Sequence, residues 1–264
     1  MTRADACLGS GMARKGRMKS NIQDLQIIIK HYLEKHGFER FAPKTVLFDM
    51  DGVLYDSMPM HAIAWQRSMA HYGITMTSDD AYATEGARGI DTIREMVRRQ
   101  QGRDISLDEA QVMYDLKSKT FHELGVAPVF PGVIDLMRKI TDCGMTVGVV
   151  TGSGQRPLIG RLLDDFGEFL DECHITTAYD VDRGKPLPDP YLMGLQKAGG
   201  LQPWEGIVVE NAPLGVQAGA AARCLTVAVN SGPLPDAVLA NAGADIVLKK
   251  MTQLAEQWQQ LTTV

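Results

Sequence analysis

The sequence is short of the features that mark several classes of protein. Its four cysteines, Cys7, Cys143, Cys173 and Cys224, are scattered without a C-x-x-C pair, so we expect reduced thiols and a cytoplasmic location. No apolar run approaches the roughly 20 residues of a membrane span, and no apolar segment follows the basic residues near the N-terminus. We therefore expect neither a membrane partner nor a signal peptide. The net charge of −5 argues against a nucleic-acid partner.

What remains is the composition of an ordinary globular protein. The chain has 264 residues, of which 45% are hydrophobic and 22% are charged. This length is sufficient for one large domain or two smaller ones. The oligomeric state is not encoded in any pattern of the sequence, and we expect a monomer.

From residue 44 onward, short apolar segments alternate with helical ones. This pattern is typical of an α/β fold with a doubly wound, Rossmann-like parallel sheet. The short segments are apolar on both faces, as are the strands of a sheet that is covered by helices on both sides. The expected strands span residues 45–50, 146–151, 174–178, 206–210, 225–229 and 245–248.

One stretch interrupts this alternation. Residues 58–130 contain no convincing strand and offer helical segments near 60–72, 79–84, 91–101 and 108–124. We expect an all-helical cap domain inserted after the first strand, between core segments 44–57 and 131–250. Because ligands of open α/β sheets bind beyond the carboxyl ends of the strands, such a cap would lie over the binding site.

The N-terminal region reads differently from the rest. Residues 1–19 have no helical or strand pattern and are expected to form a disordered leader. Residues 20–43 are expected to contain an added helix over 20–36, which begins with a capping box of Ser20 and Gln23. Its apolar residues recur at helical spacing, so the helix should pack on the body of the protein.

Polar residues stand at the ends of the expected strands. They lie in the segments "FDMDGVLYDS", "VVTGSG", "GKPLPDPYL" and "VVENAPLGVQAG". Parallel strands place their carboxyl ends at one edge of a sheet, so these residues should converge there. Two acids that are two residues apart in a strand point to the same side and repel each other unless a cation or a proton lies between them. A loop with hydroxyl side chains that leads into a helix is a favourable binding site for phosphate. The residues are Asp49, Asp51, Thr151, Gly152, Ser153, Lys185, Glu210 and Asn211.

These four segments resemble the motifs of the haloacid dehalogenase superfamily of phosphotransferases. Within it, the chain is similar to the β-phosphoglucomutase-like subgroup, whose helical cap is inserted after the first strand. The segment "MHAIAW" (60–65) is also similar to the hinge of this subgroup. The resemblance covers roughly residues 44 to 250 and leaves out the expected helix at 20–36.

The resemblance implies phosphoryl transfer through a covalent intermediate. Asp49 would be the nucleophile that forms an aspartyl phosphate. Asp51 would act as the general acid toward the leaving group and then as the base toward water. Lys185 and the loop Thr151–Ser153 would bind the oxygens of the phosphoryl group.

The implied cofactor is Mg²⁺, which prefers oxygen ligands. Its ligands would be the Asp49 side chain, the Asp51 backbone carbonyl, and Glu210 or Asn211. The family pattern more commonly has two acids at the last two positions, so Asn211 leaves the site one negative charge short. We expect Glu85, in the cap segment "YATEGARGIDTI", to reach the metal when the cap closes. The alternative is a solvated loop acid.

Three further cap residues are candidates for contact with the site. Arg88 and Lys117 could contact a distal phosphate or another anionic group of the substrate. Arg88 is shifted by one position from the cap arginine of the subgroup, because Gly89 takes that place. The second phosphate of a sugar bisphosphate would then be held less well. His61 could orient Asp51 or mark the hinge, or it could simply pack.

Three functions are compatible with these residues. The leading one is an Mg²⁺-dependent phosphohydrolase for inorganic pyrophosphate or a small phosphorylated metabolite. The segments "EGARG", "VVTGSGQ", "ENAPLGVQAG" and "AVNSGPL" resemble a pyrophosphate-hydrolysing branch of the subgroup. The alternatives are a β-phosphoglucomutase-type sugar-phosphate mutase and a non-catalytic module that kept the fold. The intact Asp49, Asp51, Thr151 and Lys185 argue against the last of these.

Overall fold

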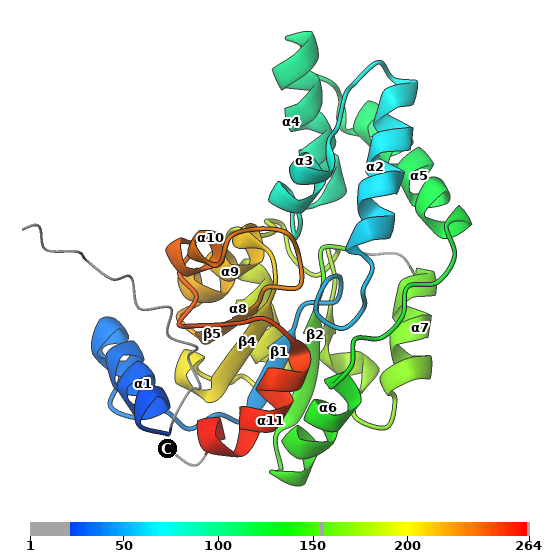
Figure 1. Ribbon diagram of the computed structural model, residues 1–264. Coiled ribbons are helices and arrows are strands. Elements are labelled where there is room, and N and C mark those ends of the chain that lie inside the picture. The colour runs from blue at the N-terminus through cyan, green and yellow to red at the C-terminus, as the bar shows by residue number, and fades with distance from the viewer. Residues whose placement is uncertain (1–21, 154–155, 263–264) are drawn as a thin grey trace, which may run out of the picture.

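A parallel six-stranded sheet lies at the centre of the molecule (Figure 1). The computed structural model describes residues 22–153 and 156–262, so the expected leader 1–19 and Ser20 lie outside the described part. The strand order is β3-β2-β1-β4-β5-β6, which confirms the doubly wound α/β fold. The strands are β1 (Thr45–Phe48), β2 (Thr146–Val150), β3 (Ile175–Thr176), β4 (Gly206–Glu210), β5 (Leu225–Val229) and β6 (Ile246–Leu248).

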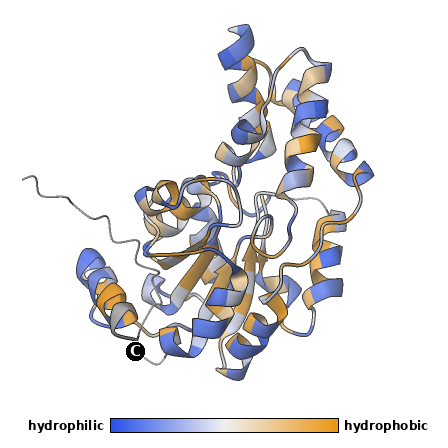
Figure 2. Ribbon diagram, viewed as in Figure 1, coloured by the Kyte–Doolittle hydropathy of each residue, from blue (hydrophilic) through white to orange (hydrophobic). Residues whose placement is uncertain are grey.

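Both faces of the sheet are covered, because successive strand residues point to opposite sides. In β1, Val46 and Phe48 belong to the main apolar core, whereas Leu47 belongs to a smaller cluster on the other face. Figure 2 shows strands that are apolar throughout, and helices with polar outer faces. The core helices are α1 (Ile22–His36), α6 (Val133–Asp142), α7 (Arg156–Phe166), α8 (Asp189–Lys197), α9 (Pro213–Ala221), α10 (Asp236–Asn241) and α11 (Met251–Thr262).

The two ends of the described chain both contribute to the main core. In α1, Leu25, Ile29 and Tyr32 are buried, and the Tyr32 hydroxyl donates a hydrogen bond to the Arg223 carbonyl at 2.9 Å. The expected packing of this helix on the body is therefore seen. The expectation that the core ends at residue 250 is wrong, because α11 buries the whole of Trp258 in the same core.

Four helices form a separate group beyond one end of the sheet (Figure 1). They enclose their own apolar cluster, which is distinct from the core of the sheet. The chain enters and leaves this cap side by side, since the Asp56 amide donates to the Pro128 carbonyl at 2.9 Å. The cap helices are α2 (Met58–His71), α3 (Ser78–Ala83), α4 (Gly89–Gln101) and α5 (Leu107–Glu123).

Four of the six strands are shorter than expected, whereas β4 and β5 have the expected bounds. Strand β1 ends at Phe48, and the chain turns sharply at Gly52, whose φ of +82° is one that glycine adopts readily. Strand β3 has two residues in place of the five expected. Over the described residues, no helix has both the length and the apolar character needed to cross a bilayer.

Candidate active site

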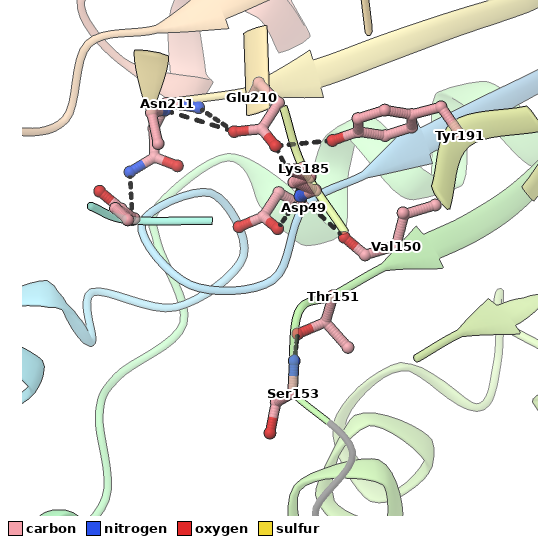
Figure 3. Close-up of polar contacts among 10 residues, drawn as sticks. Asp49, Val150, Thr151, Ser153, Lys185, Tyr191, Glu210 and Asn211 are labelled. Carbon is pink, nitrogen blue, oxygen red and sulfur yellow. Dashed lines mark hydrogen bonds and ion pairs between the residues drawn. The ribbon is translucent and has the colours of Figure 1, made fainter. Parts of the chain in front are cut away.

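Asp49 and Lys185 form a buried ion pair at the carboxyl end of β1 (Figure 3). Lys185 Nζ lies 2.5 Å from Asp49 Oδ1 and 2.6 Å from Glu210 Oε1, and it also donates to the Val150 carbonyl at 3.2 Å. Strands β1, β2 and β4 are neighbours in the sheet, so each brings one of these partners to the same point. The sequence predicts that Asp49, Lys185 and Glu210 converge, and in the structure Lys185 contacts both acids.

Glu210 is held by protein donors on both of its carboxylate oxygens. Oε1 accepts from Lys185 and from the Tyr191 hydroxyl at 2.7 Å, and Oε2 accepts from the backbone amides of Asn211 and Ala212. The side chain is fully buried. Glu210 is therefore positioned to hold Lys185, and its expected contact with the metal stays a prediction.

Asp51 faces the cap. Its Oδ1 accepts a hydrogen bond from Ser57 Oγ at 2.6 Å and lies 3.1 Å from His61 Nε2. The other ring nitrogen of His61 lies 2.7 Å from Lys117 Nζ, so the ammonium donates to it. His61 is stacked on Phe121, with 4.1 Å between the ring centroids. The two expected cap residues His61 and Lys117 are thus linked to Asp51.

The loop after β2 adds the hydroxyl groups. The Thr151 amide donates to the Thr176 carbonyl of β3, and the Ser153 amide donates to Thr151 Oγ1 at 3.0 Å. Gly152 lies against the cap, where a Cβ would come within 3.2 Å of the Gly86 carbonyl. This loop faces the Asp49 carboxylate from the next strand, as expected for the cradle of a phosphoryl group.

Glu85 of the cap lies against Asn211 of the core. The Asn211 Nδ2 donates to Glu85 Oε1 at 2.7 Å, and both side chains are buried. The turn at Gly52 permits this approach, because a Cβ there would lie 2.0 Å from Asn211 Nδ2 and 2.7 Å from Glu85 Oε1. The alternative of a solvated loop acid does not describe Glu85.

The oxygens at this point suit a magnesium ion. Asn211 Oδ1 is buried and has no hydrogen-bond partner within the described residues. Buried polar atoms almost always have a partner, and an unpaired one calls for an explanation such as an ion. The Asp49 and Glu85 carboxylates line the same cavity. This set of oxygen donors fits the hard cation Mg²⁺.

The raised pKa values of two carboxyls in the cluster are also consistent with a bound cation. Burial, together with the charges of Glu210 and Asp51, raises the pKa of Asp49 to about 7, although Lys185 opposes this. Burial also raises the pKa of Glu85 well above its usual value. Added positive charge would return both carboxyls to their ionised forms, which are the forms that bind a metal.

Asp51 behaves in the opposite way. Burial would raise its pKa, but His61, the Ser57 hydrogen bond and the charge of Lys117 together lower it to about 2. The pKa of His61 is itself lowered by burial and by Lys117, so the ring is neutral at neutral pH. Asp51 is therefore ionised at neutral pH, which is the form that a general base requires.

A cavity of about 80 Å³ lies between the cap and the core. Arg88 does not belong to its described lining: its guanidinium bonds the Asp91 carboxylate at 2.7 Å and the Asp182 carbonyl at 2.8 Å. Of the cap candidates, the structure thus brings all but Arg88 to the cavity. The polar side chains that line it are Asp49, Asp51, His61, Glu85, Tyr114, Lys117, Thr151 and Ser153, with Thr84 and Thr92 beside them.

Two residues of this site were not identified from the sequence. Ser57 fixes Asp51, and Tyr191 fixes Glu210. Both stand inside motifs that were recognised, "FDMDGVLYDS" and "GKPLPDPYL". The signal was present in their position, but serine and tyrosine in these places also suit simple capping or packing.

The parallel sheet, the helical cap and the carboxylates between them are consistent with a hydrolase that acts on phosphate groups. The family model for haloacid dehalogenase-like hydrolases matches residues 43–223, and the chain belongs to this family. It is an enzyme of the phosphatase kind, as expected from the four motifs.

Several characterised proteins and solved structures are similar to the chain. Hexitol phosphatase A of Escherichia coli is 34% identical over 188 residues, which cover 71% of this chain and 83% of that protein. Pyrophosphatase PpaX of Bacillus pumilus is 29% identical and covers 80% and 94% of the two chains. A structure described as "Putative beta-phosphoglucomutase from Bacteroides vulgatus" is 42% identical, with a TM-score of 0.88 and coverage of 92% and 98%.

Proposed function

We propose that this enzyme is an Mg²⁺-dependent phosphohydrolase that acts on a compact substrate, with inorganic pyrophosphate as the leading candidate. The observation that carries the proposal is the place of Glu85, which fills part of the cavity beside the phosphoryl position. The cavity of about 80 Å³ offers room for roughly five to eight water-sized groups, if each needs about 10–15 Å³. A compact substrate such as pyrophosphate suits this space better than a hexose ring with its phosphate.

The first step is attack by the Asp49 carboxylate on phosphorus. The P–O bond to the leaving group breaks, and its electron pair leaves with the second phosphate. Lys185 and the Thr151–Ser153 loop bind the oxygens of the transferred group, which is most of what phosphoryl transfer asks of a protein. When bound, Mg²⁺ would keep Asp49 ionised and offset the charge of the phosphoryl oxygens.

The second step restores Asp49. Water attacks the aspartyl phosphate, Asp51 accepts a proton from that water, and the bond between phosphorus and the Asp49 oxygen breaks. Asp51 suits this role because it is ionised and is aligned by Ser57 and His61. Orthophosphate is the product of each step when pyrophosphate is the substrate.

The protonation state of Asp51 also bears on the leaving group. A pKa of about 2 makes Asp51 a poor proton donor at neutral pH. A sugar alkoxide needs such a donor, because the pKa of a hydroxyl is near that of water, about 15.7. A phosphate leaving group is far more acidic, since the second pKa of a phosphate monoester is about 6, and so depends less on a proton donor. This difference favours pyrophosphate over a sugar phosphate.

Lys117 supports the same substrate from the cap side. Its buried ammonium lines the cavity, within 5.0 Å of the Trp65 ring centroid. It would meet the distal phosphate of pyrophosphate, while Arg88 is engaged outside the cavity by Asp91 and Asp182. Sugar-phosphate mutases must also bind a second, remote phosphate, and Arg88 as placed here does not serve that purpose.

A sugar-phosphate mutase is the second candidate, because the structure with 42% identity carries that description. The two are separated by their products. Purified protein with Mg²⁺ is assayed for orthophosphate release from pyrophosphate, a hexitol phosphate and β-glucose 1-phosphate, and for conversion of the last to glucose 6-phosphate. The Asp49→Asn protein serves as control.

We expect the largest kcat/KM with pyrophosphate and no isomerised sugar phosphate. A larger kcat/KM with a sugar phosphate than with pyrophosphate would overturn the substrate assignment. Formation of glucose 6-phosphate that depends on Asp49 would establish the mutase instead.

A further inference from the structure

A cluster of three different metal-ligating side chains lies away from the catalytic edge. Asp171, Cys173 and His174 each offer one ligand atom, and these atoms all lie within 4.8 Å of one another. The cluster surrounds a short 3₁₀ helix, η1 (Glu172–His174), which leads directly into β3. It stands at the amino end of that strand, whereas Asp49 follows the carboxyl end of β1.

The local backbone brings the three residues together. The His174 amide donates to the Asp171 carbonyl at 3.0 Å and closes the turn. With three residues per turn, the side chains at positions 171 and 174 stack one above the other. Cys173 lies between them in the chain and is exposed. The turn thus presents a carboxylate, a thiol and an imidazole on one small patch.

The fold makes no other use of these side chains. Across residues 22–153 and 156–262, no hydrogen bond or ion pair involves the Asp171 carboxylate, the Cys173 thiol or the His174 imidazole. Nearby polar groups are engaged elsewhere: Lys197, for instance, bonds the Ile175 carbonyl and Asp180. The three ligand atoms can therefore rotate toward a common centre without breaking a contact.

The ligand types select the cation. Zinc and similar late first-row metals prefer thiolate and imidazole, while Mg²⁺ prefers oxygen alone. Zinc–ligand bonds of about 2.0–2.3 Å place two ligands of a tetrahedral ion roughly 3–4 Å apart. The separations of at most 4.8 Å need only a modest side-chain rotation to reach this geometry.

We propose that Asp171, Cys173 and His174 form a surface site for a zinc-type divalent cation, distinct from the oxygen-lined catalytic cluster. The three side chains supply three of four tetrahedral positions, and water takes the fourth. On binding, the Cys173 S–H bond breaks, a sulfur–metal bond forms, and the proton passes to the buffer. The net charge of the site rises by one, because a cation of charge +2 binds and one proton leaves.

Cobalt is the probe for this site, because Co²⁺ occupies zinc sites and a bound thiolate gives an intense near-ultraviolet charge-transfer band. The full-length protein, freed of metal with a chelator and kept reduced, is titrated with Co²⁺ in the presence of excess Mg²⁺. We expect a thiolate band that saturates at one equivalent and is abolished by one equivalent of Zn²⁺.

Matched variants locate the ligands. Cys143→Ser removes another exposed cysteine and should keep the band. Cys173→Ser should abolish it, and Asp171→Asn or His174→Gln should weaken Co²⁺ binding by roughly tenfold or more. All four positions lie outside the catalytic cluster, so circular dichroism and activity with Mg²⁺ should be unchanged.

Two results would overturn the proposal. One is the absence of any thiolate band at one equivalent of Co²⁺ in the parent protein. The other is a band that persists in the Cys173→Ser protein, which would assign the metal to another thiol such as Cys143 or Cys7. Neither result affects the proposed hydrolysis, since that is assayed separately with Mg²⁺ alone.

Discussion

The Asn211 amide of the core donates a hydrogen bond to the Glu85 carboxylate of the cap, across 126 positions of sequence and a distance of 2.7 Å. The contact leaves Asn211 Oδ1 without a partner in the described protein and directs a second carboxylate toward the Asp49 cluster. We propose that a cap lying against the core in this way also completes the metal site. Substrate would be enclosed and activated together.

Glu85→Gln should raise the Mg²⁺ concentration for half-maximal rate by about tenfold and lower kcat. The reason is that the neutral amide keeps the size of the side chain but removes one negative charge from the cluster. The measurement is a magnesium titration of the rate at saturating substrate. A titration curve that matches the parent would show that Glu85 has no part in metal binding.

Asn211→Asp provides a matched rescue of that variant. In the double variant, the amide and the carboxylate exchange places across the contact, and the total charge of the pair is restored. We expect the Mg²⁺ midpoint to return most of the way toward the parent value. Failure of the exchange to improve the midpoint would mean that geometry, and not charge, limits the Glu85 variant.

Asp49→Asn should reduce turnover by at least roughly 10³-fold, because no other side chain can form the covalent intermediate. The fold should survive, since the amide fits the same space and Lys185 keeps Glu210 as a partner. The measurements are the rate of phosphate release and the thermal unfolding midpoint. Clean protein that retained several per cent of the parent rate would rule out Asp49 as the nucleophile.

Asp51→Asn should slow turnover by about 10²–10⁴-fold, the range for loss of a general base. The Mg²⁺ midpoint should hardly change, because the Asp51 carboxylate is bound by Ser57 and faces His61. A shift in midpoint as large as that of Glu85→Gln would contradict this separation of roles. Ser57→Ala is the companion variant, with a smaller loss of rate expected.

Lys117 should set an alkaline limit on substrate binding. Burial lowers its pKa to about 8, against an opposing effect of Asp51. The ammonium is charged below this pH and is lost above it, so KM for pyrophosphate should rise by up to roughly tenfold between pH 8 and 9. Lys117→Arg keeps its charge and should show no such rise. An identical rise in both proteins would assign the effect to another group.

The lowered pKa of Lys117 should also make the stability of the protein depend on pH. A lysine in the unfolded chain keeps its proton to about pH 10.4, so between about 8 and 10.4 the unfolded state binds more protons. Lys117 should therefore make the free energy of unfolding larger as the pH rises through that window. Lys117→Met should remove this contribution, which denaturant titrations at several pH values would detect.

The architecture could be predicted from sequence because it depends on period and order. Apolar strands alternating with helices specify the parallel sheet, and the missing strand between residues 58 and 130 specifies the inserted cap. The limits of elements were less accessible. Strand β3 keeps only two residues, since just Ile175 and Thr176 pair with β2. The last helix was missed because the motifs end before it, although Trp258 is buried in the core.

The catalytic edge was predictable to the extent that backbone position decides it. Asp49 and Thr151 directly follow strands, so topology brings them together, and Lys185 reaches Asp49 from the loop between β3 and α8. The partners of Glu210 were not predictable, because they depend on which way its side chain turns. Arg88 is similar: its contacts with Asp91 and the Asp182 carbonyl are set by packing between two domains. No local sequence pattern indicates which way these side chains turn.

The paired connections of the cap have a consequence for how such enzymes diversify. The Asp56 amide donates a hydrogen bond to the Pro128 carbonyl, and Tyr55 forms a β-bridge with Val129. The two connections between cap and core therefore lie side by side. A gene segment that encodes the cap can be exchanged at these two connections without altering the strand order of the core. Chimeras that join a foreign cap at these two positions should inherit its choice of leaving group while keeping the nucleophile of their host.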